Sequence, residues 1–187
     1  MNCSSHRSGV LCRRLLAAVA ALSALSGIGV ADDAGPQPVA MIFDTDLGND
    51  VDDAMALAVI HALADRGQCE LLAVTVTKDN PYAGACVDLL NTFYGRPEIP
   101  IGTVRDGMAR EDGKYIRQLA TAGDDGRPRY PHDLTSGADA PEAVGLLRKT
   151  LAGRPAASVV MVQVGFSTPL ARLLDSRPAG NSPLDGK

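Results

Sequence analysis

The chain has 187 residues, of which 45% are hydrophobic and 21% are charged, and its formal net charge is −4. These proportions are typical of a globular protein and exclude a fibrous or disordered chain. Lysine and arginine do not gather into a basic patch and tryptophan is absent, so the sequence predicts no nucleic-acid partner.

The first segment of the chain is typical of a secretory signal peptide. Early arginines supply positive charge, an apolar stretch rich in Ala and Leu follows, and the small residues at 29–31 suit a cleavage site. We therefore expect a signal peptide over residues 1–31, a polar linker over 32–37 and a domain over 38–187. The mature protein is then expected to be exported, periplasmic or extracellular, with no stable membrane anchor after processing.

Five aspartates follow the first apolar run of this domain. The run Val39–Phe43 predicts a buried strand, and Gly48-Asn49 predicts a turn. The segment from Asp52 predicts the start of a helix, where acidic side chains suit the macrodipole. The five aspartates are Asp44, Asp46, Asp50, Asp52 and Asp53. They are expected at the carboxyl end of a strand, where open α/β sheets bind ligands.

Carboxylates this close together repel, and each raises the pKa of its neighbour unless a cation lies among them. A hard divalent cation relieves the conflict, because Ca²⁺ takes about six to eight oxygen ligands and Mg²⁺ about six. The alternative explanation is a solvated acidic helix start. The position of the acids at a buried strand end favours the metal site.

The rest of the domain alternates between strands and helices. We expect strands over 68–77, 97–102 and 158–164, and helices over 83–94, 139–152 (Pro141 in its first turn) and 169–174. Residues 103–138 have little apolar periodicity and are expected to form a long functional loop. Strands separated by helices predict an α/β fold with an open, doubly wound, mostly parallel sheet.

Two cysteines, Cys69 and Cys86, remain after removal of the signal peptide. Export would permit a disulfide between them. Because Cys69 opens a predicted strand and Cys86 lies in a predicted helix, we expect two free buried thiols instead.

Two segments of the chain resemble one enzyme family. Asp44-Thr45-Asp46-Leu47-Gly48, followed by Asp52-Asp53-Ala54, is similar to the DxDxGxDDA signature of the inosine–uridine-preferring nucleoside hydrolases, and the GNDVDDA form is similar to a bacterial branch of that family. Residues 164–171 resemble the family's G-x-x-T-N-[IL]-A loop, with Pro169 in place of the Asn. The resemblance extends from about Ala40 to the C-terminus.

The resemblance implies a calcium-dependent reaction in which water cleaves the N-glycosidic bond of a purine or pyrimidine ribonucleoside, giving ribose and free base. It implies calcium ligation by Asp46, Asp53 and the main-chain carbonyl of Thr168. It also implies that Asp46 accepts the proton of the attacking water.

The resemblance implies further roles for residues around these ligands. Asn80 and Asp52 would contact the substrate, and Asp44 would support the site, whereas Asp50 has no counterpart in the signature. A turn-forming Asn before a proline is the alternative explanation for Asn80.

Family domains extend beyond this chain and supply a catalytic His beside another calcium-binding Asp. His61 and His132 have no such neighbour, so the resemblance implies an N-terminal part, truncated after about the fourth strand. The open sheet edge of such a part predicts a homo-oligomer.

Two alternative functions remain open from the sequence. The first is a non-catalytic metal- or ribose-binding protein. The second is a haloacid-dehalogenase-type phosphohydrolase with Mg²⁺ and Asp44 as nucleophile, although such enzymes carry Thr or Val where this chain has Gly48.

Overall fold

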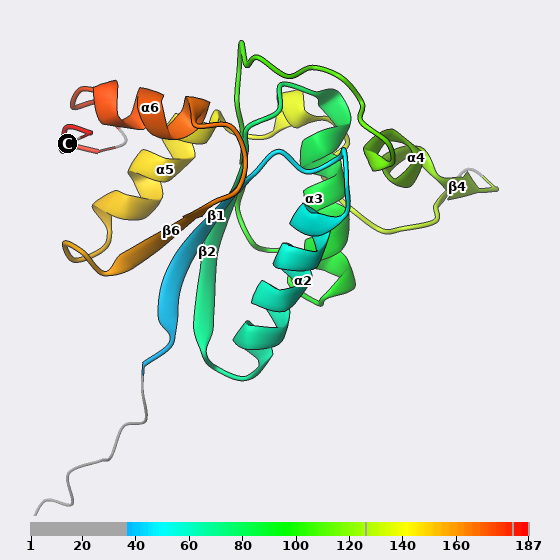
Figure 1. The fold of residues 1–187 in the computed structure, drawn as a ribbon, viewed down its shortest axis with the longest axis horizontal. Helices are drawn as coiled ribbons and strands as arrows, with labels where there is room; N and C mark the ends of the chain where they lie inside the picture. The colour runs from blue at the N-terminus through cyan, green and yellow to red at the C-terminus, as the bar shows by residue number, and fades with distance from the viewer. Residues whose placement is uncertain (1–36, 126, 181, 187) are drawn as a thin grey trace, which may run out of the picture. The chain divides into compact units, whose positions relative to one another are not determined.

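Four parallel strands form the central sheet of the described residues, 37–125, 127–180 and 182–186 of the computed structural model (Figure 1). The strands are β1 (Val39–Thr45), β2 (Cys69–Val76), β3 (Ile101–Thr103) and β6 (Val159–Gln163). The expected signal peptide lies outside the described residues, as does the expected linker except for residue 37. Within the described part, no helix is long and apolar enough to cross a membrane.

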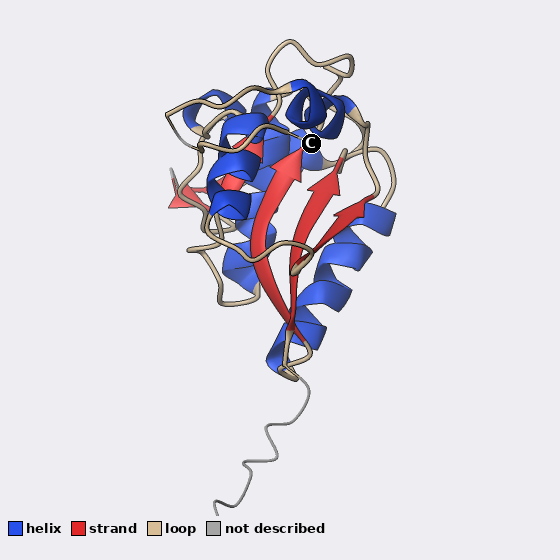
Figure 2. Ribbon diagram, turned by 90° about the vertical axis from the view of Figure 1, so that its left-hand side faces the viewer, coloured by secondary structure: helices blue, strands red, loops and turns tan. Residues whose placement is uncertain are grey.

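The strand order, β3-β2-β1-β6, confirms the predicted doubly wound sheet. The chain adds β2 and β3 on one side of β1 and then adds β6 on the other side, with every pairing parallel. The order therefore reverses at β1, and ligands of open α/β sheets bind beside such a reversal, at the carboxyl ends of the strands. Figure 2 shows neighbouring strands running the same way toward that edge.

Helices cover both faces of this sheet. Helices α2 (Asp52–Asp65) and α3 (Pro81–Phe93) pack on one face, and α5 (Ala143–Ala152) and α6 (Thr168–Asp175) on the other. The pleat divides the strand residues between two cores, because successive side chains of a strand point to opposite faces. Phe43 and Val74 belong to the core under α2 and α3, whereas Ile42 and Ala73 belong to the core under α5 and α6.

The expected long loop contains short elements that periodicity did not reveal. They are helix α4 (Ile116–Thr121), the antiparallel pair β4 (Gly123–Asp124) and β5 (Arg127–Pro128), and the 3₁₀ helix η1 (Gly137–Asp139). Ile116 is completely buried, and the Asp88 carboxylate on α3 accepts 2.7 Å hydrogen bonds from the backbone N–H groups of Asp133 and Leu134. Elements this short carry too few residues for a hydrophobic period to show.

Two smaller expectations are settled by the same structure. Helix α5 begins at Ala143 rather than at residue 139, because Glu142 caps it by accepting a hydrogen bond from the Gly145 N–H, so that Pro141 precedes the helix. Cys69 and Cys86 are both buried and free, as predicted.

Candidate functional site

Asp44 lies near the carboxyl end of β1 and is completely buried. Its Oδ2 accepts a 2.6 Å hydrogen bond from Thr75 Oγ1 on β2, whereas its Oδ1 has no hydrogen-bond partner among the described residues. Burial raises the pKa of Asp44 to about 7; the Thr75 hydrogen bond opposes this rise and the charge of Asp46 adds to it. A buried carboxylate oxygen of this kind is stabilised by either a proton or a cation.

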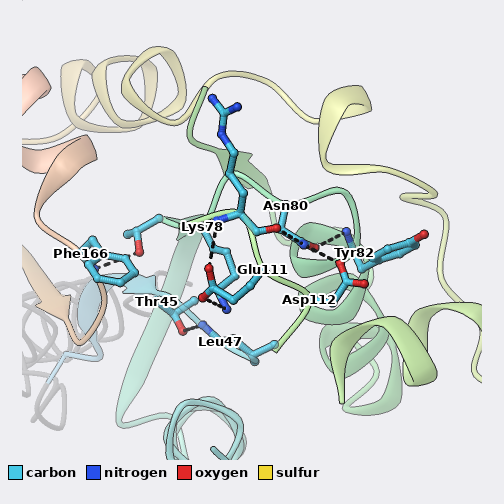
Figure 3. Close-up of polar contacts among 10 residues, drawn as sticks. Thr45, Leu47, Lys78, Asn80, Tyr82, Glu111, Asp112 and Phe166 are labelled. Carbon is cyan, nitrogen blue, oxygen red and sulfur yellow. Dashed lines mark hydrogen bonds and ion pairs between the residues drawn. The ribbon is translucent and has the colours of Figure 1, made fainter. Parts of the chain in front are cut away.

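Asp53, in the first turn of α2, is hydrogen-bonded to Thr45, the last residue of β1. Thr45 Oγ1 donates a 2.5 Å hydrogen bond to Asp53 Oδ1 and accepts a 3.1 Å hydrogen bond from the Leu47 N–H (Figure 3 shows Thr45 and Leu47). Burial raises the pKa of Asp53, the Thr45 hydrogen bond opposes the rise, and the charges of three neighbouring aspartates add to it. The neighbours are Asp46, Asp52 and Asp50.

The structure brings Asp50, Asp52 and Asp53 together, with one carboxylate oxygen of each within 4.8 Å of the others. Asp50 had no role in the sequence prediction, although its spacing before Asp52 at a helix start is the signal that could have indicated one. Asp46 is half-buried and is not part of this group, but its charge acts on both Asp44 and Asp53. A donor set made only of oxygens suits a hard divalent cation.

The loop after β6 lies against the acidic end of β1. The N–H groups of Val164 and Gly165 donate to the Asp44 carbonyl at 2.9 and 3.2 Å. A Cβ on Gly165 would lie 2.6 Å from the Asp46 nitrogen, so only glycine permits this close approach. Thr168 follows as the half-buried first residue of α6. The loop thus starts at the same strand end, and calcium ligation by the Thr168 carbonyl stays a prediction.

Asn80 caps α3, a role that was not predicted, because the alternative explanation for this residue was a turn before the proline. Its Oδ1 accepts a 2.8 Å hydrogen bond from the Tyr82 N–H, and its Nδ2 donates to the Arg110 carbonyl and to Asp112 Oδ1, both at 3.0 Å (Figure 3). Both amide hydrogens are therefore in use. A ribose contact by Asn80 stays a prediction, and it requires one of these partners to leave.

Lys78, at the carboxyl end of β2, was not singled out by the sequence. Its side chain is completely buried, and its Nζ lies 3.0 Å from Oε1 of Glu111 (Figure 3). Because Nζ makes no well-directed hydrogen bond within the described chain, the contact is mainly an ion pair. No local pattern could have indicated it, since the partner comes from the long segment between β3 and α5.

Residues 109–115, here called the strap, join the two loops that carry the candidate site. At one end the Asp79 N–H donates to the Ala109 carbonyl at 2.8 Å. At the other end the Lys114 N–H donates to the Gly48 carbonyl at 2.7 Å, and the Tyr115 hydroxyl donates to the Asp50 carbonyl at 2.8 Å. The strap therefore holds both the turn before α2 and the loop before α3.

Comparison with known proteins identifies the family. The family model described as inosine-uridine preferring nucleoside hydrolase matches residues 41–184. No match was found among curated proteins or solved structures. The matched range contains every aspartate of the acidic end of β1, as well as Asn80 and Thr168, and it favours a nucleoside hydrolase over the haloacid-dehalogenase alternative. The chain belongs to the inosine-uridine preferring nucleoside hydrolase family.

Proposed function

We propose that this chain binds calcium at the acidic end of β1 and hydrolyses the N-glycosidic bond of ribonucleosides, releasing ribose and free base. Family membership supports the hydrolase chemistry. The observation that carries the proposal is the meeting of the Asp50, Asp52 and Asp53 oxygens just after β1, the strand that ends with the buried Asp44 and Thr45 and at which the strand order reverses.

The residues present fit a divalent cation. Asp44 has a buried carboxylate oxygen without a hydrogen-bond partner in the described chain, and the pKa of Asp53 is raised by burial and by its acidic neighbours. Both features are relieved by positive charge. Asp53 belongs both to the predicted ligands and to the cluster in the structure, so we assign it as the central ligand, with Asp46 and Asp50 as candidates beside it. When bound, the cation makes a neighbouring water easier to deprotonate.

The chain's own residues then have separate tasks. Asp46 accepts the proton of the attacking water, while the water oxygen forms the new bond to the anomeric carbon. The bond to the base breaks, its electron pair leaves on the base nitrogen, and that nitrogen takes up a proton from solvent. Thr45 holds Asp53 in place, and Thr75 holds Asp44. The surrounding carboxylates also stabilise the positive charge that develops on the sugar ring, as in other glycoside hydrolyses.

A turnover assay with a panel of purine and pyrimidine ribonucleosides tests this proposal. We expect release of free base in the presence of Ca²⁺ and loss of release when a chelator removes it. Asp125→Asn is a matched control, because Asp125 is exposed, lies in the β4–β5 turn and has a φ of 51° that Asn tolerates. Calcium binding without base release would contradict the proposal and favour the non-catalytic alternative.

A further inference from the structure

The strap occupies the hydrogen-bonding groups of Asn80, the residue predicted to contact the ribose. It takes both amide hydrogens of Asn80 through Arg110 and Asp112, and it is hydrogen-bonded to the turn that leads into α2. A close backbone approach supports the second contact: Gly113 has a φ of 63°, and a Cβ there would collide with the Gly48 carbonyl. In this arrangement Asn80 has no hydrogen left to donate to a sugar hydroxyl.

One attachment of the strap differs from the others in its electrostatics. The Lys78 ammonium is completely buried, and its counter-ion Glu111 belongs to the strap and has a side chain that is 56% exposed. Another ion pair of the strap, between Arg110 and Asp79 at 3.3 Å, has an Arg110 side chain that is 67% exposed, and ion pairs that exposed contribute little. A buried charge depends much more strongly on its partner. Loss of the Lys78–Glu111 pair is therefore expected to weaken the attachment of the strap more than loss of the Arg110–Asp79 pair.

We propose that Lys78 and Glu111 form a latch that holds the strap closed over the candidate site, and that a ribonucleoside gains access to Asn80 only after this latch opens. The identity of the ligand in this inference rests on the proposed function, whereas the latch itself does not. A ligand that binds only the open state has its apparent affinity reduced in proportion to the open fraction. Weakening the latch should therefore strengthen substrate binding.

Amide hydrogen exchange of the protein without ligand tests the latch directly. Glu111→Gln keeps the shape of the side chain and removes its charge, and Glu98→Gln makes the same change at an exposed residue outside the strap. We expect peptides covering residues 109–117 to exchange about tenfold faster in Glu111→Gln than in the native protein. The exchange rate of peptides from α3 should be the same in Glu111→Gln as in the native protein, and every peptide of Glu98→Gln should exchange at the native rate.

Three results of these exchange measurements would overturn the latch. Native exchange of the strap in Glu111→Gln would show that the pair does not hold it, and an equal acceleration of every peptide would show that the pair supports only the fold. The double variant Lys78→Met with Glu111→Gln leaves no unpaired ammonium. If the strap of the double variant exchanged at the native rate, the faster exchange of Glu111→Gln would come from the unpaired ammonium, and the latch would also be refuted. If the strap of the double variant exchanged as fast as that of Glu111→Gln, the latch would be supported.

Kinetics test the second part of the inference, control of access. Glu111→Gln should lower KM by about threefold to tenfold and leave kcat nearly unchanged, because the chemistry is untouched while the open fraction rises. A faster-exchanging strap with an unchanged or higher KM would overturn control of access. Absence of hydrolysis would refute the proposed function. The latch would still be tested by the exchange measurement, because that measurement needs neither nucleoside nor metal.

Discussion

Two overlapping sets of oxygen ligands meet around Asp53. The family resemblance pairs Asp53 with Asp46 and the Thr168 carbonyl, whereas the structure groups it with Asp50 and Asp52. The sets differ in burial, because Asp46 is half-buried whereas Asp50 and Asp52 are exposed. The family resemblance gives the role of proton acceptor to Asp46, so we keep Asp46 as the base and Asp50 as a candidate ligand.

The two sets predict different consequences for two single substitutions. Asp46→Asn keeps the shape of the side chain and removes its basicity, so we expect kcat for ribonucleoside hydrolysis to fall by about 10²–10⁴. Asp50→Asn should mainly weaken calcium binding and leave kcat largely intact once calcium is saturating. The measurement is kcat at saturating Ca²⁺ for both variants. A more damaging Asp50→Asn would show that the roles assigned to the acidic residues are wrong.

A second group of buried polar residues lies between α2 and α3. His61 is completely buried, with its Nε2 3.0 Å from Asn91 Oδ1 and its Nδ1 3.4 Å from an Arg96 nitrogen, and its ring stacks on Tyr94. Arginine can only donate, so Nδ1 must accept and Nε2 must carry the proton. Burial lowers the pKa of His61; the Asn91 hydrogen bond opposes the shift and the charge of Arg96 adds to it. The fold therefore requires neutral His61.

This requirement predicts how stability depends on pH. The folded-state pKa of His61 lies below the unfolded value of about 6.5, so its stabilising contribution is complete above that value and is lost as the pH falls below it. Urea unfolding at about pH 7.5 and about pH 5.5 should show a larger loss of unfolding free energy in the native protein than in His61→Gln. Equal losses in the two proteins would refute a role for His61.

At the scale of helices and strands, the sequence predicted those elements whose signals are local. The apolar run Val39–Phe43 ended at polar residues and became β1, and the Asp pair at 52 and 53 began α2. The capping role of Asn80 was not predicted although its signal is also local, since an Asn two residues before a backbone N–H can cap a helix by itself.

The strap and its latch could not be predicted in this way. Lys78 and Glu111 are neighbours only because the segment between β3 and α5 returns over the carboxyl end of β2. That path is held by scattered contacts, such as the burial of Ile116 and the hydrogen bonds to Asp88, and none of these has a sequence period. The Asp50 cluster had a local signal in the spacing of Asp50 before Asp52, but the turn geometry decides which carboxylates converge, so the spacing alone did not identify the cluster.

At the scale of the whole described unit, β6 is an edge strand that is paired only with β1 among the described strands. It carries apolar residues with no charge between Val159 and Gln163, and Val160 and Val164 are 47% and 49% exposed. Natural edge strands usually carry lysine, proline or a bulge that prevents pairing with another chain. We therefore propose that this edge pairs with another copy of the chain.

We expect that association to depend on β6. Light scattering over a range of protein concentrations should show oligomers for the native protein, and Val160→Lys should shift the population to monomer because a charge on an edge strand blocks pairing. Val160→Thr keeps the β-branched shape without the charge and serves as the control, which should associate as the native protein does. A native protein that stays monomeric at every concentration would contradict this expectation.

Calorimetric titration of Ca²⁺ into the native protein, Asp53→Asn and the control Asp125→Asn tests the central claim most directly, because Asp53 belongs to both ligand sets. We expect calcium to bind the native protein and Asp125→Asn with equal affinity, and to bind Asp53→Asn at least about tenfold more weakly, since one charged oxygen ligand is lost. Absence of binding to the native protein at millimolar calcium, or equal binding to all three proteins, would contradict a metal site at the acidic end of β1.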